Sequence, residues 1–198
     1  MKPLSQKCRH GETGVAAIEF ALVFPVLLLM FFGTINIAQY AVELRRIGAS
    51  SNLVGDLVAR SQSTISRATV DDYFTAVELM FRPNDQTWVQ TNIGIDVYVY
   101  ARTAAPPPGT PGPPPAAPVK WSKFYQNTQR CTPPDANMAS TNPIGALLPD
   151  SDVVVAVVCT TFTAPAANYP GFEYLVNRTI EKQQVSRPRQ SLTIDLIN

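Results

Sequence analysis

The chain has 198 residues, a formal net charge of +1 and a single histidine, His10. The small net charge predicts no nucleic-acid partner, because that requires a strong basic field. His10 lies in the N-terminal tail, so the rest of the chain lacks the imidazole that Ser-His-Asp hydrolysis, Cys-His proteolysis and His-rich zinc sites need. We therefore expect a protein that is not an enzyme, with no metal, no cofactor and no small-molecule substrate.

An apolar segment near the N-terminus is the strongest structural signal. It carries no charge over residues 20–35, and only Asn36 and Gln39 are strongly polar up to Tyr40. About 20 helical residues span about 30 Å, which is enough to cross the hydrocarbon core of a membrane. A secretory signal peptide is the alternative, but its apolar core has only about 7–15 residues. We expect a retained transmembrane helix with a kink at Pro25, where one backbone hydrogen bond is lost.

Basic residues on both sides of the apolar segment bear on its orientation. Lys2, Lys7 and Arg9 precede it, and short basic flanks remain on the cytoplasmic side. Arg45 and Arg46 follow it and weaken this argument. The basic tail favours a cytoplasmic N-terminus with the C-terminal domain outside the cytoplasm.

The cysteines are divided by the apolar segment. Cys8 precedes it, whereas Cys131 and Cys159 follow it. Two cysteines beyond a membrane helix favour one disulfide in an oxidising compartment, which agrees with the orientation that the basic tail predicts. Such a disulfide would stabilise the domain by about 3–4 kcal/mol in the chain-entropy model. The alternative is a pair of unbonded, buried thiols.

An acidic residue, Glu19, lies at the start of the apolar segment. Burial of its charge in a membrane costs a few kcal/mol. In one interpretation Glu19 remains hydrated in the headgroup region. In the other, cleavage after Gly14 makes Val15 the new N-terminus, and Glu19 of one helix pairs with the Val15 amine of the next helix in a bundle. That pairing would offset the cost of burial and fix the axial register between subunits.

Two further helical segments are predicted. Helical spacing continues through residues 46–68, either as an extension of the membrane helix or as a short amphipathic connector. Thr69 and Asp72 form a variant of the capping box that predicts the start of a second helix, which Pro83 ends. An apolar stripe along this helix is expected in the core and consists of Val70, Tyr73, Phe74, Val77, Met80 and Phe81.

The remaining elements are predicted strands. Apolar and polar residues alternate over residues 93–99, which predicts a half-buried strand. Residues 152–162 are too apolar for one hydrated face and predict a central strand. Weaker strands are predicted over residues 179–186 and 191–197. Residues 120–125 alternate aromatic residues with lysine, and we interpret them as a strand partner or loop anchor rather than a surface that stacks on nucleic acid.

These elements predict an α+β domain over residues 69–198, in which an antiparallel sheet packs on helices. The proline-rich residues 104–118 interrupt it, because prolines prevent regular strand pairing and favour polyproline II. We interpret this segment as a semi-rigid surface loop rather than a ligand for an aromatic groove.

The segment GVAAIEFALVFPVLLLMFFGTINIAQ resembles the TadE-like family of the tight-adherence (Tad) pilus system. In that family a glutamate is followed by an aromatic residue, a proline follows within two turns and a glycine ends the first apolar block. The corresponding residues are Glu19, Phe20, Pro25 and Gly33. The resemblance is dense over residues 11–45.

The resemblance implies a basic prepilin-type leader over residues 1–14, a transmembrane helix over residues 15–45 and cleavage between Gly14 and Val15 by a prepilin peptidase. It implies a minor pilin or pseudopilin of the bacterial inner membrane with a periplasmic domain, which either enters an extracellular pilus or only assists its assembly. The expected partners are membrane lipid, the peptidase, other pilins and Tad assembly proteins. The alternative is an unprocessed bitopic inner-membrane protein whose periplasmic domain binds a partner.

Overall fold

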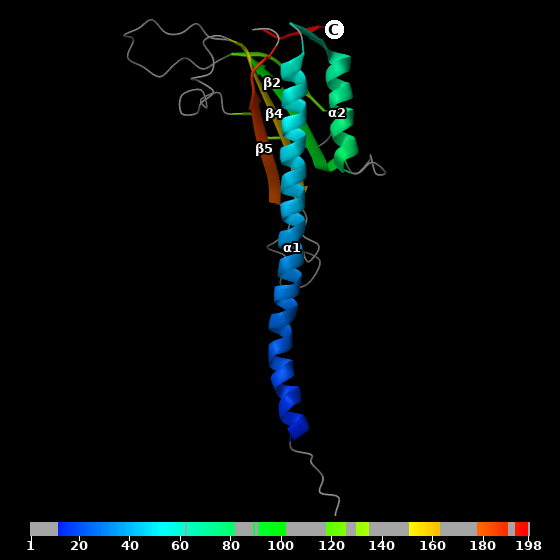
Figure 1. Ribbon diagram of the computed structural model, residues 1–198, viewed down its shortest axis with the longest axis vertical. Helices are drawn as coiled ribbons and strands as arrows, with labels where there is room; N and C mark the ends of the chain where they lie inside the picture. The colour runs from blue at the N-terminus through cyan, green and yellow to red at the C-terminus, as the bar shows by residue number, and fades with distance from the viewer. Residues whose placement is uncertain are drawn as a thin grey trace, which may run out of the picture.

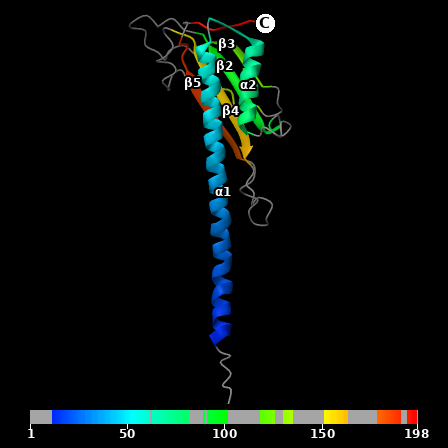
Figure 2. The ribbon, with the colours of Figure 1, turned by 45° about the vertical axis from the view of Figure 1, so that its right-hand side comes forward.

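A long helix and a small domain make up the computed structural model (Figure 1). Helix α1 (Glu12–Arg60) extends from the domain as a stalk, and helix α2 (Arg67–Phe81) lies beside its upper part (Figures 1 and 2). The structure describes residues 12–61, 63–81, 89, 91–101, 118–125, 130–134, 151–162, 178–189 and 193–197. Most of the predicted leader and nearly all of the predicted proline-rich loop lie outside the described residues.

Four strands form one antiparallel sheet in the order β3-β2-β4-β5. A parallel pair, β1 and β6, lies outside this sheet. Together with the two helices, these strands confirm the predicted α+β class. The strand bounds are β1 (Thr64–Ser66), β2 (Ile93–Tyr100), β3 (Val119–Phe124), β4 (Val153–Phe162), β5 (Arg178–Ser186) and β6 (Asp195–Ile197).

The upper part of α1 packs on the sheet as a direct extension of the apolar helix, so the short connector is the wrong alternative. Ile47, Val54 and Val58 recur at helical spacing and are fully buried in the core against β4 and β5. The helix lies close to β5 at Gly55, where a Cβ atom would lie 3.2 Å from the Cγ atom of Gln184. A larger residue at this position would require the neighbouring side chains of the sheet to move by a few tenths of an ångström.

Helix α2 begins earlier than its sequence predicts. It starts at Arg67, and the backbone N–H of Thr69 donates a hydrogen bond to Oγ of Ser66 at 3.1 Å. Ser66 is therefore the N-cap, and the prediction that Thr69 opens the helix is wrong by one turn. Most of the predicted stripe is buried, but Met80 is 42% exposed.

Strand β2 is buried on both faces, so the prediction of a half-buried strand is wrong. Ile95 and Val97 belong to the core beneath the helices, whereas Tyr98 on the opposite face packs in a second apolar cluster with Cys131. Strand β4 contributes to both clusters and lies between β2 and β5, which confirms the predicted central strand. The alternation of apolar and polar residues along β2 correctly indicates that the strand has two different faces. Both faces are nevertheless covered by other parts of the protein.

The C-terminal segment is held at the outer edge of the sheet by β3. Nζ of Lys120 lies 3.1 Å from Oδ2 of Asp152 and 2.7 Å from Oδ1 of Asp195. Nε1 of Trp121 donates a hydrogen bond to the carbonyl oxygen of Ile194 at 3.0 Å. Because β3 pairs with β2, the prediction that residues 120–125 are a strand partner is confirmed. The predicted strand near the C-terminus forms β6, which pairs with β1 in parallel.

Candidate functional site

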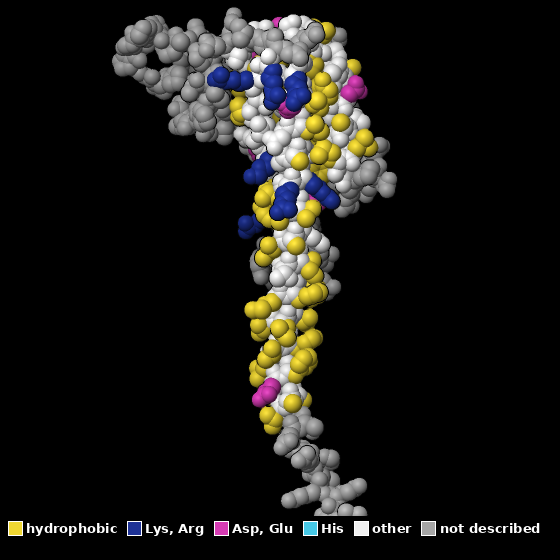
Figure 3. Space-filling model, viewed as in Figure 1, with side chains coloured by type: hydrophobic (Ala, Val, Ile, Leu, Met, Phe, Trp, Pro, Cys, Tyr) yellow, Lys and Arg dark blue, Asp and Glu magenta, His cyan; other side chains and the backbone are white. Residues whose placement is uncertain are grey.

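The lower part of α1 extends below the domain, and apolar side chains cover much of the face that Figure 3 shows. Phe20 and Leu22 point to nearly opposite sides of the helix, since two residues correspond to about 200° of rotation, and they are 61% and 73% exposed. A helix that is apolar all round requires an apolar environment, in a membrane or inside a bundle. We name residues 15–43 the anchor helix. It is long and apolar enough to cross a membrane.

The predicted cleavage and register residues lie together at the lower end of the anchor helix. Gly14 and Val15 occupy its first turns, and Glu19 is exposed one turn further along. Residues four apart share one face of a helix, so Val15 and Glu19 lie on the same side. The ring of Phe20 contacts that of Phe24, with centroids 5.3 Å apart. The structure thus brings one carboxylate and the predicted new N-terminus to a single face.

Helix α1 continues through Pro25 without interruption. The missing N–H of proline still removes one intrahelical hydrogen bond at that turn. A kink at Pro25 stays a prediction from the sequence.

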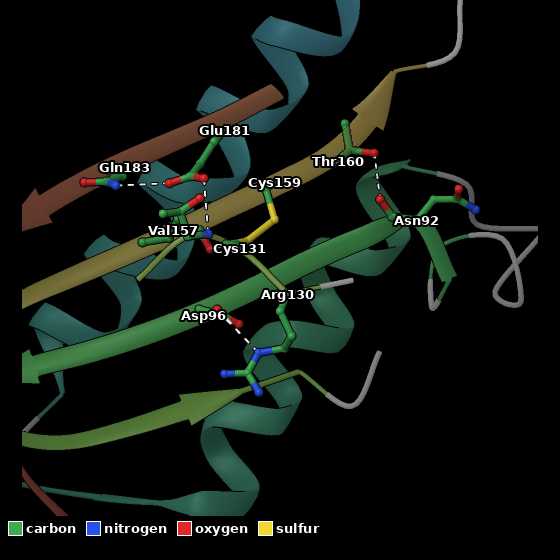
Figure 4. The surroundings of a disulfide bond; sticks show 10 residues. Asn92, Asp96, Arg130, Cys131, Val157, Cys159, Thr160, Glu181 and Gln183 are labelled. Atoms are coloured by element: carbon green, nitrogen blue, oxygen red, sulfur yellow. Dashed lines mark hydrogen bonds and ion pairs between the residues drawn. A yellow bond between two sulfur atoms is a disulfide. The ribbon is translucent and has the colours of Figure 1, made fainter. Parts of the chain in front are cut away.

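The second notable site is the disulfide between Cys131 and Cys159, which confirms the predicted pairing (Figure 4). Their Cα atoms are 5.5 Å apart. Cys159 lies on β4, and Cys131 belongs to residues 130–134, which we name the clamp segment. The disulfide holds the clamp segment against the face of the sheet that is remote from the helices.

The clamp segment also makes polar contacts with two further strands (Figure 4). Nε of Arg130 lies 3.7 Å from Oδ2 of Asp96 on β2. The backbone N–H of Thr132 donates a hydrogen bond to Oε2 of Glu181 on β5 at 3.3 Å. Through these contacts and the disulfide, five residues join β2, β4 and β5 across the sheet.

Asp96 is a fully buried carboxylate that the sequence does not mark as a candidate site residue. Burial raises its pKa from 3.8 to about 6, and the nearby Arg130 guanidinium opposes that shift only in part. Burial and the charge of Asp96 together raise the pKa of Tyr98 to about 12. The guanidinium of Arg130 also lies over the ring of Phe124, 3.7 Å from its centroid. The alternating pattern of residues 93–99 predicts that Asp96 is exposed to solvent. Its burial depends on the clamp segment, which contacts this face of the sheet.

Replacement of Asp96 by asparagine is expected to stabilise the protein at pH 8 and to have little effect at pH 4. The folded-state pKa of about 6 exceeds the ordinary value of 3.8, so the folded protein retains a proton that the unfolded chain releases. The resulting penalty is absent below about pH 4 and complete above about pH 6, where it is on the order of 3 kcal/mol. Urea unfolding of both proteins in detergent, with the disulfide intact, measures the difference. An equal difference at both pH values would contradict the assigned role of the carboxylate.

These features define a class of protein: an α+β domain carried on one N-terminal helix that can anchor it in a membrane. Residues 14–43 match the family described as TadE-like protein. The match confirms the resemblance for the anchor helix, contains all the predicted cleavage and register residues, and indicates a membrane protein related to the Tad pilus. No curated protein and no solved structure matches the chain significantly.

Within the described ranges, no group of three or more His, Cys, Asp or Glu side chains is arranged to hold a metal ion. Two of the carboxylates, those of Asp71 and Asp152, have structural contacts. Oδ2 of Asp71 lies 2.9 Å from Nζ of Lys123, and Oδ2 of Asp152 accepts a hydrogen bond from the backbone N–H of Ile194 at 2.9 Å. These ion pairs and hydrogen bonds join secondary-structure elements.

Proposed function

We propose that this chain is a minor pilin or pseudopilin that takes part in assembly of a Tad pilus, after a prepilin peptidase cleaves it between Gly14 and Val15. The observation that carries the proposal is the continuity of α1. Its lower part is exposed, apolar and TadE-like, whereas its upper part is the central helix of the domain core. The role is structural, without catalysis by this chain.

The position of the proposed cleavage bond is suited to proteolysis. It lies in the first turn of α1, which begins at Glu12. The first N–H groups of a helix have no intrahelical acceptor, so this turn opens at small energetic cost. With the leader on the cytoplasmic side and the domain in the periplasm of a bacterial inner membrane, the bond would lie at the membrane surface, where a membrane peptidase works.

Cleavage would create an amine on the face of the helix that carries Glu19. In a bundle of such helices, the amine of one chain can meet the carboxylate of its neighbour. This pairing would satisfy both charges inside an apolar environment and would set the axial register. The proposed partners are therefore membrane lipid before assembly, and other pilins and Tad assembly proteins afterwards.

The buried upper part of α1 would make the domain follow the anchor helix. Ile47, Val54 and Val58 fix the helix to the sheet through the core, and Gly55 permits the close approach. Because no linker separates the anchor from the domain, extraction of the anchor helix from the membrane would carry the domain with it at a fixed orientation.

The mass of the membrane-bound protein tests the proposal. In cells that contain an active prepilin peptidase, we expect the chain to lose residues 1–14, so that its first residue is Val15. Substitution Gly14→Leu is expected to block this loss, because the bulky side chain stands at the cleavage bond. Intact-mass spectrometry of the membrane fraction measures both.

The matched control is Gly11→Leu, which places the same side chain elsewhere in the leader and should leave cleavage unchanged. An intact N-terminus in the presence of the active peptidase would refute processing. That result would favour the unprocessed bitopic protein instead.

A further inference from the structure

Basic side chains gather where α1 leaves the domain (Figure 3). Arg45 and Arg46 follow the apolar part of α1, and Arg178 and Lys182 lie on β5. Arg45, Arg46, Arg178 and Lys182 are all exposed, and we name these four residues the basic collar. Two of them lie more than 130 residues beyond the other two in the sequence, so the collar is a product of the fold.

The register of the sheet places β5 at the level of the anchor helix. Arg178 is the partner of Phe162 across the β4–β5 pair. The ring of Phe162 contacts that of Tyr40, with centroids 5.5 Å apart. The start of β5 therefore lies beside the end of the apolar segment. Lys182 follows on the same face of the strand, because alternate strand residues share a face.

The basic collar has little compensating negative charge among the described residues. Oε1 of Glu43 lies 3.3 Å from Nη1 of Arg46, whose side chain remains 46% exposed. Glu181, although on the same strand as Arg178 and Lys182, lies on the opposite face and contacts the clamp segment. Among the residues that the structure describes, one carboxylate for four cations leaves a positive surface at this level.

We propose that the basic collar binds the phosphates of anionic phospholipid headgroups. With the apolar segment in the hydrocarbon core, Arg45 begins about 8 Å beyond Tyr40, which is within the polar headgroup layer. Arginine forms paired hydrogen bonds with phosphate, and basic residues close to a membrane are attracted by its anionic lipids. A lipid is favoured over an acidic protein because the collar continues directly from the segment that the membrane would surround.

The bound lipid would hold the lower edge of the domain against the membrane. Arg45 and Arg46 alone would attract lipid around the helix, but Arg178 and Lys182 add contacts on one side, beside β5. The domain would therefore have a preferred orientation relative to the membrane surface before assembly. This inference rests on the membrane anchoring in the proposed function, and it requires neither cleavage nor a pilus.

Lipid selectivity of the full chain tests the inference. The protein is inserted into nanodiscs of equal phosphatidylglycerol and phosphatidylcholine, and the retained lipids are counted by native mass spectrometry. We expect wild type to retain phosphatidylglycerol in excess. The variant Arg45→Gln/Arg178→Gln should lose about fivefold in preference for each residue, and added salt should weaken the wild-type preference.

The variant Arg67→Gln/Arg187→Gln is the matched control, because it removes the same charge from exposed positions outside the collar. It should keep the wild-type preference. The inference would be overturned if wild type retained both lipids equally. It would also be overturned if the collar variant and the control variant lost the preference for phosphatidylglycerol to the same extent. Failure of wild type to insert into a membrane of either lipid would instead refute the membrane anchoring. Co-flotation of the protein with vesicles measures insertion separately from lipid preference.

Discussion

Replacement of Glu19 by glutamine is expected to leave membrane insertion unchanged and to abolish incorporation of the chain into the pilus. Glutamine keeps the size and polarity of the side chain but removes the charge that would pair with the Val15 amine. Loss of one partner from a buried ion pair costs about 3–5 kcal/mol, because the other charge stays buried and uncompensated. A cost of that size per contact would reduce assembly more than a hundredfold. The amounts of the chain in the membrane fraction and in sheared pili measure the two effects separately.

The control for this experiment is Glu43→Gln, which makes the same chemical change in the same helix. Glu43 pairs with Arg46 at 3.3 Å, where the Arg46 side chain is 46% exposed and the Glu43 side chain is 24% exposed, and ion pairs that remain open to solvent contribute only about 0–1 kcal/mol. Glu43→Gln should therefore assemble normally. Normal assembly of Glu19→Gln would show that Glu19 is a hydrated interfacial residue and that the register is set by other contacts.

Removal of the disulfide by Cys131→Ser/Cys159→Ser is expected to lower the free energy of unfolding by about 3–4 kcal/mol. The bond joins residues 28 positions apart, so its loss allows the unfolded chain many more conformations. Its loss also removes the one covalent link between the clamp segment and the sheet. Urea unfolding of the full chain in detergent measures the change, and reduction of wild type should produce a loss of similar size.

Cys8→Ser is the control for the disulfide experiment, since Cys8 lies in the predicted leader and takes no part in the bond. This substitution should leave the free energy of unfolding unchanged. Equal stability of wild type under oxidising and reducing conditions would contradict a stabilising disulfide. Because the clamp segment packs on the face of the sheet that is remote from the helices, we expect the disulfide variant to retain its membrane insertion.

Helix α1 combines two patterns of apolar residues that correspond to its two environments. In the anchor helix the apolar residues occur on every face, which suits contact with lipid or neighbouring helices on all sides. Above it, only a stripe that includes Ile47, Val54 and Val58 is apolar, since one face contacts the sheet and the other contacts water. The change of pattern occurs within one uninterrupted helix, at the level of the basic collar.

The sequence by itself determined the features that depend on neighbouring residues. The apolar segment, its acidic residue and the TadE-like pattern all lie within about 30 consecutive positions. The central strand β4 was predictable because a continuous apolar run requires burial on both faces. The disulfide was predictable as well, because Cys131 and Cys159 are the two cysteines that follow the apolar segment.

Only the tertiary structure decided the features that depend on contacts between distant segments. Asp96 occupies a polar position in an alternating strand, and its burial follows from the clamp segment, which lies more than 30 residues further along the chain. The N-cap of α2 was displaced to Ser66, where β1 ends after pairing with β6. The basic collar arises because β5 lies beside α1. The burial and the electrostatic environment of a residue depend on which distant segments the fold places against it. The local sequence pattern does not specify those segments.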